Sequence, residues 1–167
     1  MCLDFSGGVP KQYTKGYGFK CVNDTNKPDE FTGRWPYFSN GRGGCGVKER
    51  GSSRNRVVWK IGRMYRVKHN RMAYDDSRMA TYPAGVHLYK HFGDAWRQGR
   101  YSEENNLTVL VCYYTSAKKQ DKTQIVAMRC TPLVALKTRN QKEIFQGLVT
   151  RYGVKRAIGV YLKRYND

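Results

Sequence analysis

The run from Leu107 to Thr115 is the longest β-branched and aromatic stretch in the sequence, and it constrains the fold most. It lacks polar alternation, which is typical of a strand buried on both faces, so we expect the rest of the chain to pack against it. Residues 124–130 also have strand character and follow a charged loop at 116–121, which predicts an antiparallel partner. We expect Pro132 to interrupt that partner and residues 133–136 to continue it as an edge.

Upstream of this run, short elements alternate with turn signals. Tyr82 to Gly85 predicts a turn, because proline fixes one φ angle and glycine can take a positive one. A strand at 86–89 and a short helix at 94–98 should follow, with Gly93 or Asp94 as the helix N-cap. The first strand is expected at 17–22, with odd-numbered residues on one face.

Two further strand candidates, residues 57–61 and 64–67, flank Gly62, which we interpret as a bulge. Residues 72–81 read as a polar connection.

From residue 140 onward the apolar spacing becomes helical. One stripe predicts a first helix, formed by Ile144, Phe145, Leu148, Val149 and Tyr152. Gly153 should end it, and residues 154–164 should form a second helix. The predicted fold class is therefore α+β: a single domain with a mostly antiparallel sheet, one short internal helix and two C-terminal helices. We divide it into a core at 1–136 and a basic helical extension at 137–167.

The formal net charge of +18 favours an anionic partner, because self-repulsion of that size opposes a compact state. Residues 41–72 hold ten Lys or Arg against the single acid Glu49, so half of the net charge lies in that segment. Its glycine-rich part, residues 40–56, cannot bury enough apolar surface to order itself, and we expect a mobile basic loop. Nucleic acid is the commonest anionic partner of such a protein.

The predicted binding residues are the cations of this segment and of the helical extension. They are Arg42, Lys48, Arg50, Arg54, Arg56, Lys60, Arg63, Arg66, Arg151, Lys155, Arg156, Lys163 and Arg164. Three aromatic residues are candidates for base stacking, with core packing as the alternative for each: Trp35, Tyr37 and Trp59.

No constellation of catalytic residues stands out, and we expect neither a cofactor nor a metal. His87 and His91 are four residues apart but straddle a strand and a turn, so a structural pair is favoured over metal ligation. Cys112, Cys21 and Cys130 should be buried and inert. Cys45 lies among basic residues that favour the thiolate, which makes it the candidate reactive thiol.

The start of the sequence lacks the basic and apolar regions of a signal peptide, and no apolar run approaches the roughly 20 residues that span a bilayer. Five scattered cysteines favour reduced thiols. We therefore expect a cytoplasmic protein with no membrane partner. Its oligomeric state is left open.

Several short motifs resemble a set of small uncharacterised phage and bacterial proteins. They are Met1-Cys2-Leu3, Phe19-Lys20-Cys21-Val22, Ile61-Gly62-Arg63-Met64-Tyr65 and Pro83-Ala84-Gly85-Val86-His87 with Ala95 beyond it. The resemblance covers roughly residues 1–136 and omits the two C-terminal helices. It implies a bacterial or phage-infected cell as the setting and specifies little chemistry.

Residues 85–88, 94–96 and 107–111 also resemble the ADP-ribosyltransferase fold in their order: a Gly-aromatic strand, a short helix bearing alanine, and a hydrophobic strand. The sequence departs from that family's chemistry. Glu103 and Glu104 precede the central strand where a catalytic Glu would follow it, and the first strand offers no Arg or His for a nicotinamide cofactor. The resemblance favours a degenerate relative over an active enzyme.

Three functions remain open. The first is a binding protein for nucleic acid or for a host nucleoprotein complex such as a ribosome, polymerase or nuclease. The second is a phage-encoded inhibitor that engages an anionic surface of a host protein. The third is an ADP-ribosyltransferase-like enzyme.

Overall fold

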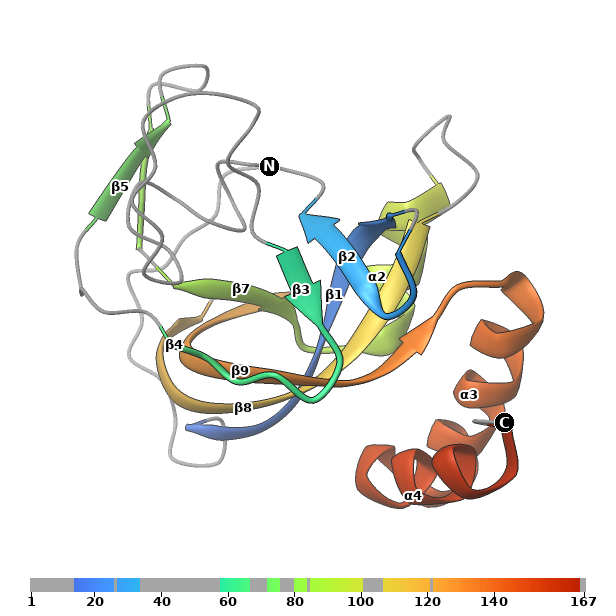
Figure 1. Cartoon of the computed structure of the whole chain (residues 1–167). Helices are drawn as coiled ribbons and strands as arrows, with labels where there is room; N and C mark the ends of the chain where they lie inside the picture. The colour runs from blue at the N-terminus through green and yellow to red at the C-terminus, as the bar shows by residue number, and fades with distance from the viewer. Residues whose placement is uncertain are drawn as a thin grey trace.

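The strand β8 (Leu107–Gln120) lies between two long partners, β1 (Lys15–Asp24) and β9 (Gln124–Leu136), as Figure 1 shows. The computed structural model describes residues 14–25, 27–33, 58–66, 72–75, 80–83, 85–100, 107–120 and 122–165. Both pairings are antiparallel, and the side chains of Val109 and Val111 are fully enclosed. The prediction that residues 107–115 form the centre of the sheet is confirmed. Their predicted pairing with 124–130 is corrected: residues 109–115 pair with 129–136, whereas 125–127 pair with 117–120 at the far end of β8.

Four shorter strands complete a seven-stranded antiparallel sheet: β2 (Glu30–Gly33), β3 (Val58–Lys60), β4 (Tyr65–Arg66) and β7 (Val86–Tyr89). β7 pairs with β9 and, where Tyr89 lies opposite Phe19, with β1. The pairings β1–β8–β9–β7–β1 therefore form a closed ring. Gly18 permits this closure, because a Cβ atom there would lie 2.9 Å from the Cβ of Leu88 on β7.

A separate two-stranded sheet pairs β5 (Met72–Asp75) with β6 (Ala80–Pro83). This corrects two expectations. Part of the predicted polar connection at 72–81 is strand, and Tyr82 and Pro83 belong to β6, where a turn was expected. A proline is compatible with a strand in a two-stranded ribbon because one edge of each strand needs no donor. Gly62 is also a turn residue with φ 77°, between β3 and β4, and does not form a bulge within one strand.

Strand β9 runs through Pro132, contrary to the predicted interruption. The register with β8 shifts by one residue between Val111 and Cys112, so that Leu133 is the extra residue of a β-bulge. The bulge changes the alternation of β9: Leu133 and Val134 both pack into the cluster beneath the helices. The charged loop expected at 116–121 is mostly strand as well, because β8 continues to Gln120 with a second register shift.

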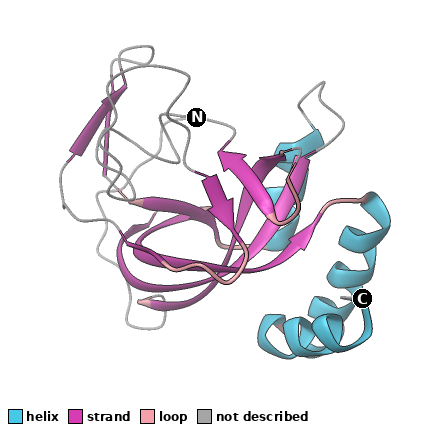
Figure 2. Cartoon of the chain, viewed as in Figure 1, coloured by secondary structure: helices cyan, strands magenta, loops and turns pink. Residues whose placement is uncertain are grey.

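Three helices in the described residues accompany the sheet: α2 (Phe92–Arg100), α3 (Arg139–Tyr152) and α4 (Val154–Tyr165), drawn in cyan in Figure 2. The chain is thus an α+β domain with one short internal helix and two C-terminal helices, as predicted. α2 begins at Phe92, two residues before the predicted start, so neither Gly93 nor Asp94 is its N-cap. The amides of Asp94 and Ala95 both donate to the carbonyl of His91.

Local sequence signals set the ends of α3. Thr138 and Gln141 form a capping box, in which each side chain accepts a hydrogen bond from the other residue's backbone amide. Gly153 ends the helix as predicted, at φ 77°, a conformation that favours glycine, and its amide donates to the carbonyl of Val149 at 2.8 Å. Because α4 starts at the next residue, the two helices form a tight hairpin.

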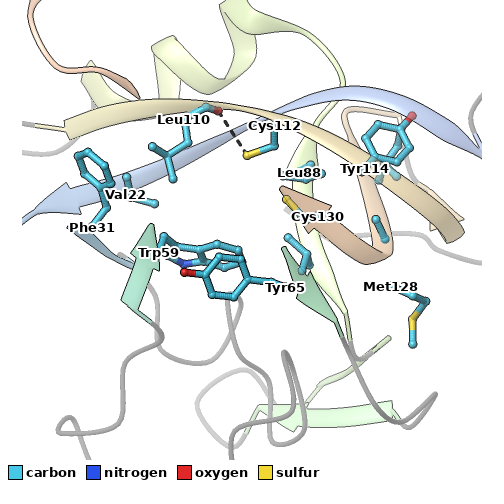
Figure 3. Packing of buried hydrophobic residues seen from close by; sticks show 13 residues of the cluster. Val22, Phe31, Trp59, Tyr65, Leu88, Leu110, Cys112, Tyr114, Met128 and Cys130 are labelled. Carbon is cyan, nitrogen blue, oxygen red and sulfur yellow. Dashed lines mark hydrogen bonds between the residues drawn. The ribbon is translucent and has the colours of Figure 1, made fainter. Parts of the chain in front are cut away.

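The sheet separates two hydrophobic cores. The inner core fills the ring of strands, where Trp59, Tyr65, Val22 and Leu110 converge, as Figure 3 shows. The outer core lies between the sheet and the helices, and Phe145 of α3 is its centre. The Phe145 ring lies 5.5 Å from Phe92 of α2 and 5.7 Å from Tyr161 of α4, so aromatic contacts join all three helices.

Candidate nucleic-acid interface

Five exposed cations lie on the hairpin of α3 and α4, and we call them the C-terminal basic face: Arg151, Lys155, Arg156, Lys163 and Arg164. Residues 139–165 contain seven Lys or Arg and the single acid Glu143. Glu143 forms an ion pair with Arg139, in which Nε lies 2.8 Å from a carboxylate oxygen, and it pairs with none of the five. Within the described ranges no carboxylate forms an ion pair with the C-terminal basic face.

The fold holds this face in place from behind. Ile158 and Tyr161 of α4 are buried in the outer core. At 3.6 residues per turn, Arg156 and Lys163, seven residues apart, project from the side of α4 that points away from this core. The C-terminal basic face is therefore carried on a packed helix, and its backbone loses little freedom when a ligand binds.

Tyr152 organises two of the guanidinium groups. The Cζ atoms of Arg151 and Arg156 lie 5.2 and 5.0 Å from the centre of its ring, within the range of cation–π attraction. One residue comes from the end of α3 and the other from the start of α4. The shared ring thus brings two positive charges together at the corner of the hairpin.

The start of α4 is an electrostatically unfavourable place for cations. Its first turn holds Lys155 and Arg156 and no acid. The aligned peptide dipoles give a helix N-terminus about half a positive charge, which favours anions there and disfavours Lys and Arg. A bound anion would reverse this unfavourable balance.

The predicted residues on β3 and β4 have three different surroundings. Lys60 is engaged, because its Nζ lies 2.6 Å from the Glu30 carboxylate. The exposed guanidinium of Arg63 lies 5.6 Å from the Tyr65 ring, and Arg66 is exposed. Trp59 is fully buried in the inner core, where its ring lies 4.5 Å from that of Tyr65. This excludes Trp59 as a stacking platform in this structure, and the core-packing alternative holds for it.

Several predicted residues lie outside the described part of the chain. These are Trp35, Tyr37, Arg42, Lys48, Arg50, Arg54 and Arg56, together with Cys45. Their assignments remain predictions.

Sequence reasoning missed a second basic area on the sheet. Lys15 of β1 and Arg129 of β9 are exposed on either side of Thr115, next to the aromatic pair Tyr17 and Tyr113. The alternation of β1 could have shown part of this, because Lys15 and Tyr17 share a face with the buried Phe19. The position of Arg129 depends on the pairing register, which the sequence does not reveal.

Two of the three cysteines that were predicted to be buried are buried, Cys112 and Cys130, whereas Cys21 is not. Cys112 and Cys130 are almost fully enclosed in the inner core. A hydrogen bond with the Cys112 thiol, followed by burial, raises the pKa of Cys130 well above its ordinary value, which disfavours the reactive thiolate. Cys21 is half-buried and donates a hydrogen bond to the carbonyl of Ala95 at 2.8 Å.

His87 is largely buried and His91 is exposed. In the described ranges no three His, Cys, Asp or Glu side chains gather as a metal-binding group. Among the same residues, no helix has both the length and the apolar character needed to cross a bilayer.

Comparison with protein-family models, with curated proteins and with solved structures finds no match.

Proposed function

We propose that this protein binds nucleic acid, bare or within a nucleoprotein complex, and that the C-terminal basic face is a principal contact. The observation that carries the proposal is that five exposed cations on a packed helical hairpin have no carboxylate partner in the described ranges. Two of them occupy a helix N-terminus, where they are unfavourable unless an anion is bound. The phosphate backbone supplies such anions at close spacing.

Arginine favours this reading over simple attraction to any acidic surface. Its planar guanidinium donates two parallel hydrogen bonds to a phosphate, and a stacked guanidinium is already oriented. Arg151 and Arg156 are held in this way by Tyr152. The resemblance noted in the sequence favours a bacterial or phage setting for the interaction.

The test is the salt dependence of oligonucleotide binding, measured by fluorescence anisotropy from about 50 to 200 mM salt. Each neutralised phosphate contributes about −0.9 to the slope of log K against log salt on duplex DNA and about −0.7 on single strands. Replacing all five residues of the C-terminal basic face with Gln should reduce the magnitude of the slope by up to about 4 and weaken binding at low salt.

A matched control removes the same charge elsewhere. Five exposed cations outside the two basic areas serve this purpose: Lys27, Arg97, Lys118, Lys122 and Arg139. This variant should keep most of the slope. Equal loss in both variants would show that net charge alone drives binding. No binding of the wild-type protein at low salt would overturn the proposal and leave a protein partner as the better explanation.

A further inference from the structure

The helices cover only part of the outer face of the sheet. Alternate residues of β8 point to this face, namely Val109, Val111, Tyr113 and Thr115. Val109 and Val111 are 1% and 0% exposed beneath the helices, whereas Tyr113 is 36% exposed. The helical cover therefore ends between Val111 and Tyr113. Beyond it, the rows of residues that lie side by side on neighbouring strands are open to solvent.

The first open row is aromatic. Tyr17 of β1 lies directly opposite Tyr113, and their ring centres are 5.5 Å apart with planes inclined at 58°. On the other side of Tyr113, Thr131 of β9 completes the row. Tyr17 is anchored against the outer core, while Tyr113 keeps exposed ring surface. The row thus presents a supported aromatic surface at the border of the helical cover.

The second open row is basic and spans four strands. The pairing register places Lys15 opposite Thr115, Thr115 opposite Arg129, and Arg129 opposite Arg66 of β4. The three cations are all exposed, and in the described ranges none has a carboxylate partner.

The Arg129–Arg66 pairing is a liability for stability, because like charges directly opposite each other on neighbouring strands repel. This pairing becomes favourable when an anion lies between the two guanidinium groups.

Together the two rows match a single-stranded polynucleotide. Neighbouring rows on one face lie about 6.8 Å apart along a strand, so bases resting on the tyrosines would leave the phosphates near the cations. Proteins that bind single strands combine aromatic side chains, on which bases stack, with a positive surface that follows the backbone. In a duplex the base faces are already stacked on their neighbours and are not available to a sheet surface.

We propose that this open part of the outer face, formed by Tyr17, Tyr113, Lys15, Arg129 and Arg66, binds single-stranded nucleic acid. The tyrosines stack on bases and the three cations contact phosphates. The inference rests on the proposed function and extends it, because it assigns a second contact surface and selects single strands over duplexes. The C-terminal basic face then supplies further backbone contacts on the helical side.

The test compares a fluorescent oligo(dT), an oligo(U) of equal length and a matched duplex against wild type and two variants at one position. Tyr113→Leu removes the aromatic ring and keeps apolar bulk, while Tyr113→Phe keeps the ring. Loss of a stacking residue lowers single-strand affinity about five- to 150-fold, the ratio equivalent to about 1–3 kcal/mol. We expect that loss for Tyr113→Leu, near-normal binding for Tyr113→Phe, and little change in duplex affinity for either.

A second pair of measurements separates binding from folding. Arg129→Gln should weaken single-strand binding and, because it relieves the repulsion with Arg66, should leave the melting temperature unchanged or raise it. A merely structural role for Arg129 would lower both. Tyr113→Leu should also melt cooperatively, which confirms that its binding defect does not come from unfolding.

The outcomes distinguish this inference from the proposed function. If duplex binds more tightly than single strands, or if Tyr113→Leu binds like wild type, the open sheet surface is not the site and this inference fails. Binding that then depends only on the C-terminal basic face would leave the proposed function intact. If the wild-type protein binds no oligonucleotide at low salt, both proposals fail.

Discussion

Glu30 and Lys60 lie directly opposite each other on β2 and β3, with 2.6 Å between a carboxylate oxygen and Nζ. The hydrogen bond from Lys60 is the main reason that the pKa of Glu30 lies below its ordinary 4.5. The pair joins two short strands at the border of the sheet, so Lys60 serves the fold and is not a free cation for phosphate.

We predict that Glu30→Gln lowers the melting temperature at neutral pH. A carboxyl whose pKa is lowered by folding stabilises the native state above 4.5, and this contribution is lost as the pH falls through the folded-state pKa. The difference between variant and wild type should therefore disappear in acid. The control is Glu143→Gln, which breaks a more exposed pair on α3 and should change little. A pH-independent difference would mean that the ion pair is not its cause.

Val111→Asp should prevent folding. An unpaired carboxylate at a fully buried position costs several kcal/mol, against a total stability of about 5–15 kcal/mol. Thr115→Asp is the matched control, because it places the same charge on the same strand and face but between the cations Lys15 and Arg129. We expect thermal denaturation to show a folded Thr115→Asp variant and no cooperative transition for Val111→Asp. Similar melting of both variants would contradict our conclusion that the helical cover of β8 ends between Val111 and Tyr113.

Lys142 is buried where α3 meets the sheet, and its Nζ donates to the carbonyls of Leu107 and Lys137 at 2.6 and 3.2 Å. Burial lowers its pKa from the ordinary 10.5. A lysine whose pKa falls on folding opposes folding while it is charged, and this cost is relieved as the pH rises through the folded-state pKa towards 10.5.

We therefore predict that the stability of wild type relative to Lys142→Met increases as the pH rises towards 10.5, as measured by chemical denaturation. The comparison with the variant cancels the opposing effect of Tyr161, whose pKa is raised by burial in both proteins. A difference that stays constant across this range would show that the ammonium is as well stabilised inside the protein as in water.

Binding kinetics should distinguish the two predicted basic clusters. We expect replacement of the C-terminal basic face by Ala to accelerate dissociation of a bound oligonucleotide, because these residues stand on packed helices. Replacement of Arg42, Lys48, Arg50, Arg54 and Arg56 should mainly slow association and flatten the salt dependence. Surface plasmon resonance on the two variants tests this. Faster dissociation in the second variant, with normal binding in the first, would reverse the two roles.

Local signals predicted the parts of the fold that depend on neighbouring residues. Three signals of this kind are the apolar stripe of α3, the end of that helix at Gly153 and the lack of polar alternation at 107–115. Each depends only on residues that are close together in the sequence. Pro132 misled the prediction for a physical reason. A proline removes one donor, but the bulge at Leu133 lets the strand continue past it, and the register that creates the bulge is set by a partner strand.

The residues of the candidate site also fall into those that local sequence predicts and those whose placement depends on strand pairing. Part of the C-terminal basic face was predictable, because helical spacing alone places Arg156 and Lys163 away from the apolar side of α4. The open sheet surface was not, because it joins Lys15, Arg129 and Arg66 from three strands, and only the pairing of those strands brings them into one row. The burial of Trp59 could not be predicted from its neighbours in the sequence, because it depends on Tyr65 and on the closed ring of strands around it.

The closed ring of strands also has a consequence for how the chain acquires its structure. Lys15 pairs with Thr115, one hundred positions along the chain, and β9 must pair in the correct register with the other edge of β8. Contacts between such distant segments require a large loop to close first, which makes folding slow compared with that of local helices. During synthesis, β1 cannot find its long partner until β8 has left the ribosome, whereas α3 and α4 can pair as soon as both are made. We therefore expect ring closure to limit the rate of folding. The hairpin of α3 and α4 should form early and dock onto the sheet late, once the ring has closed.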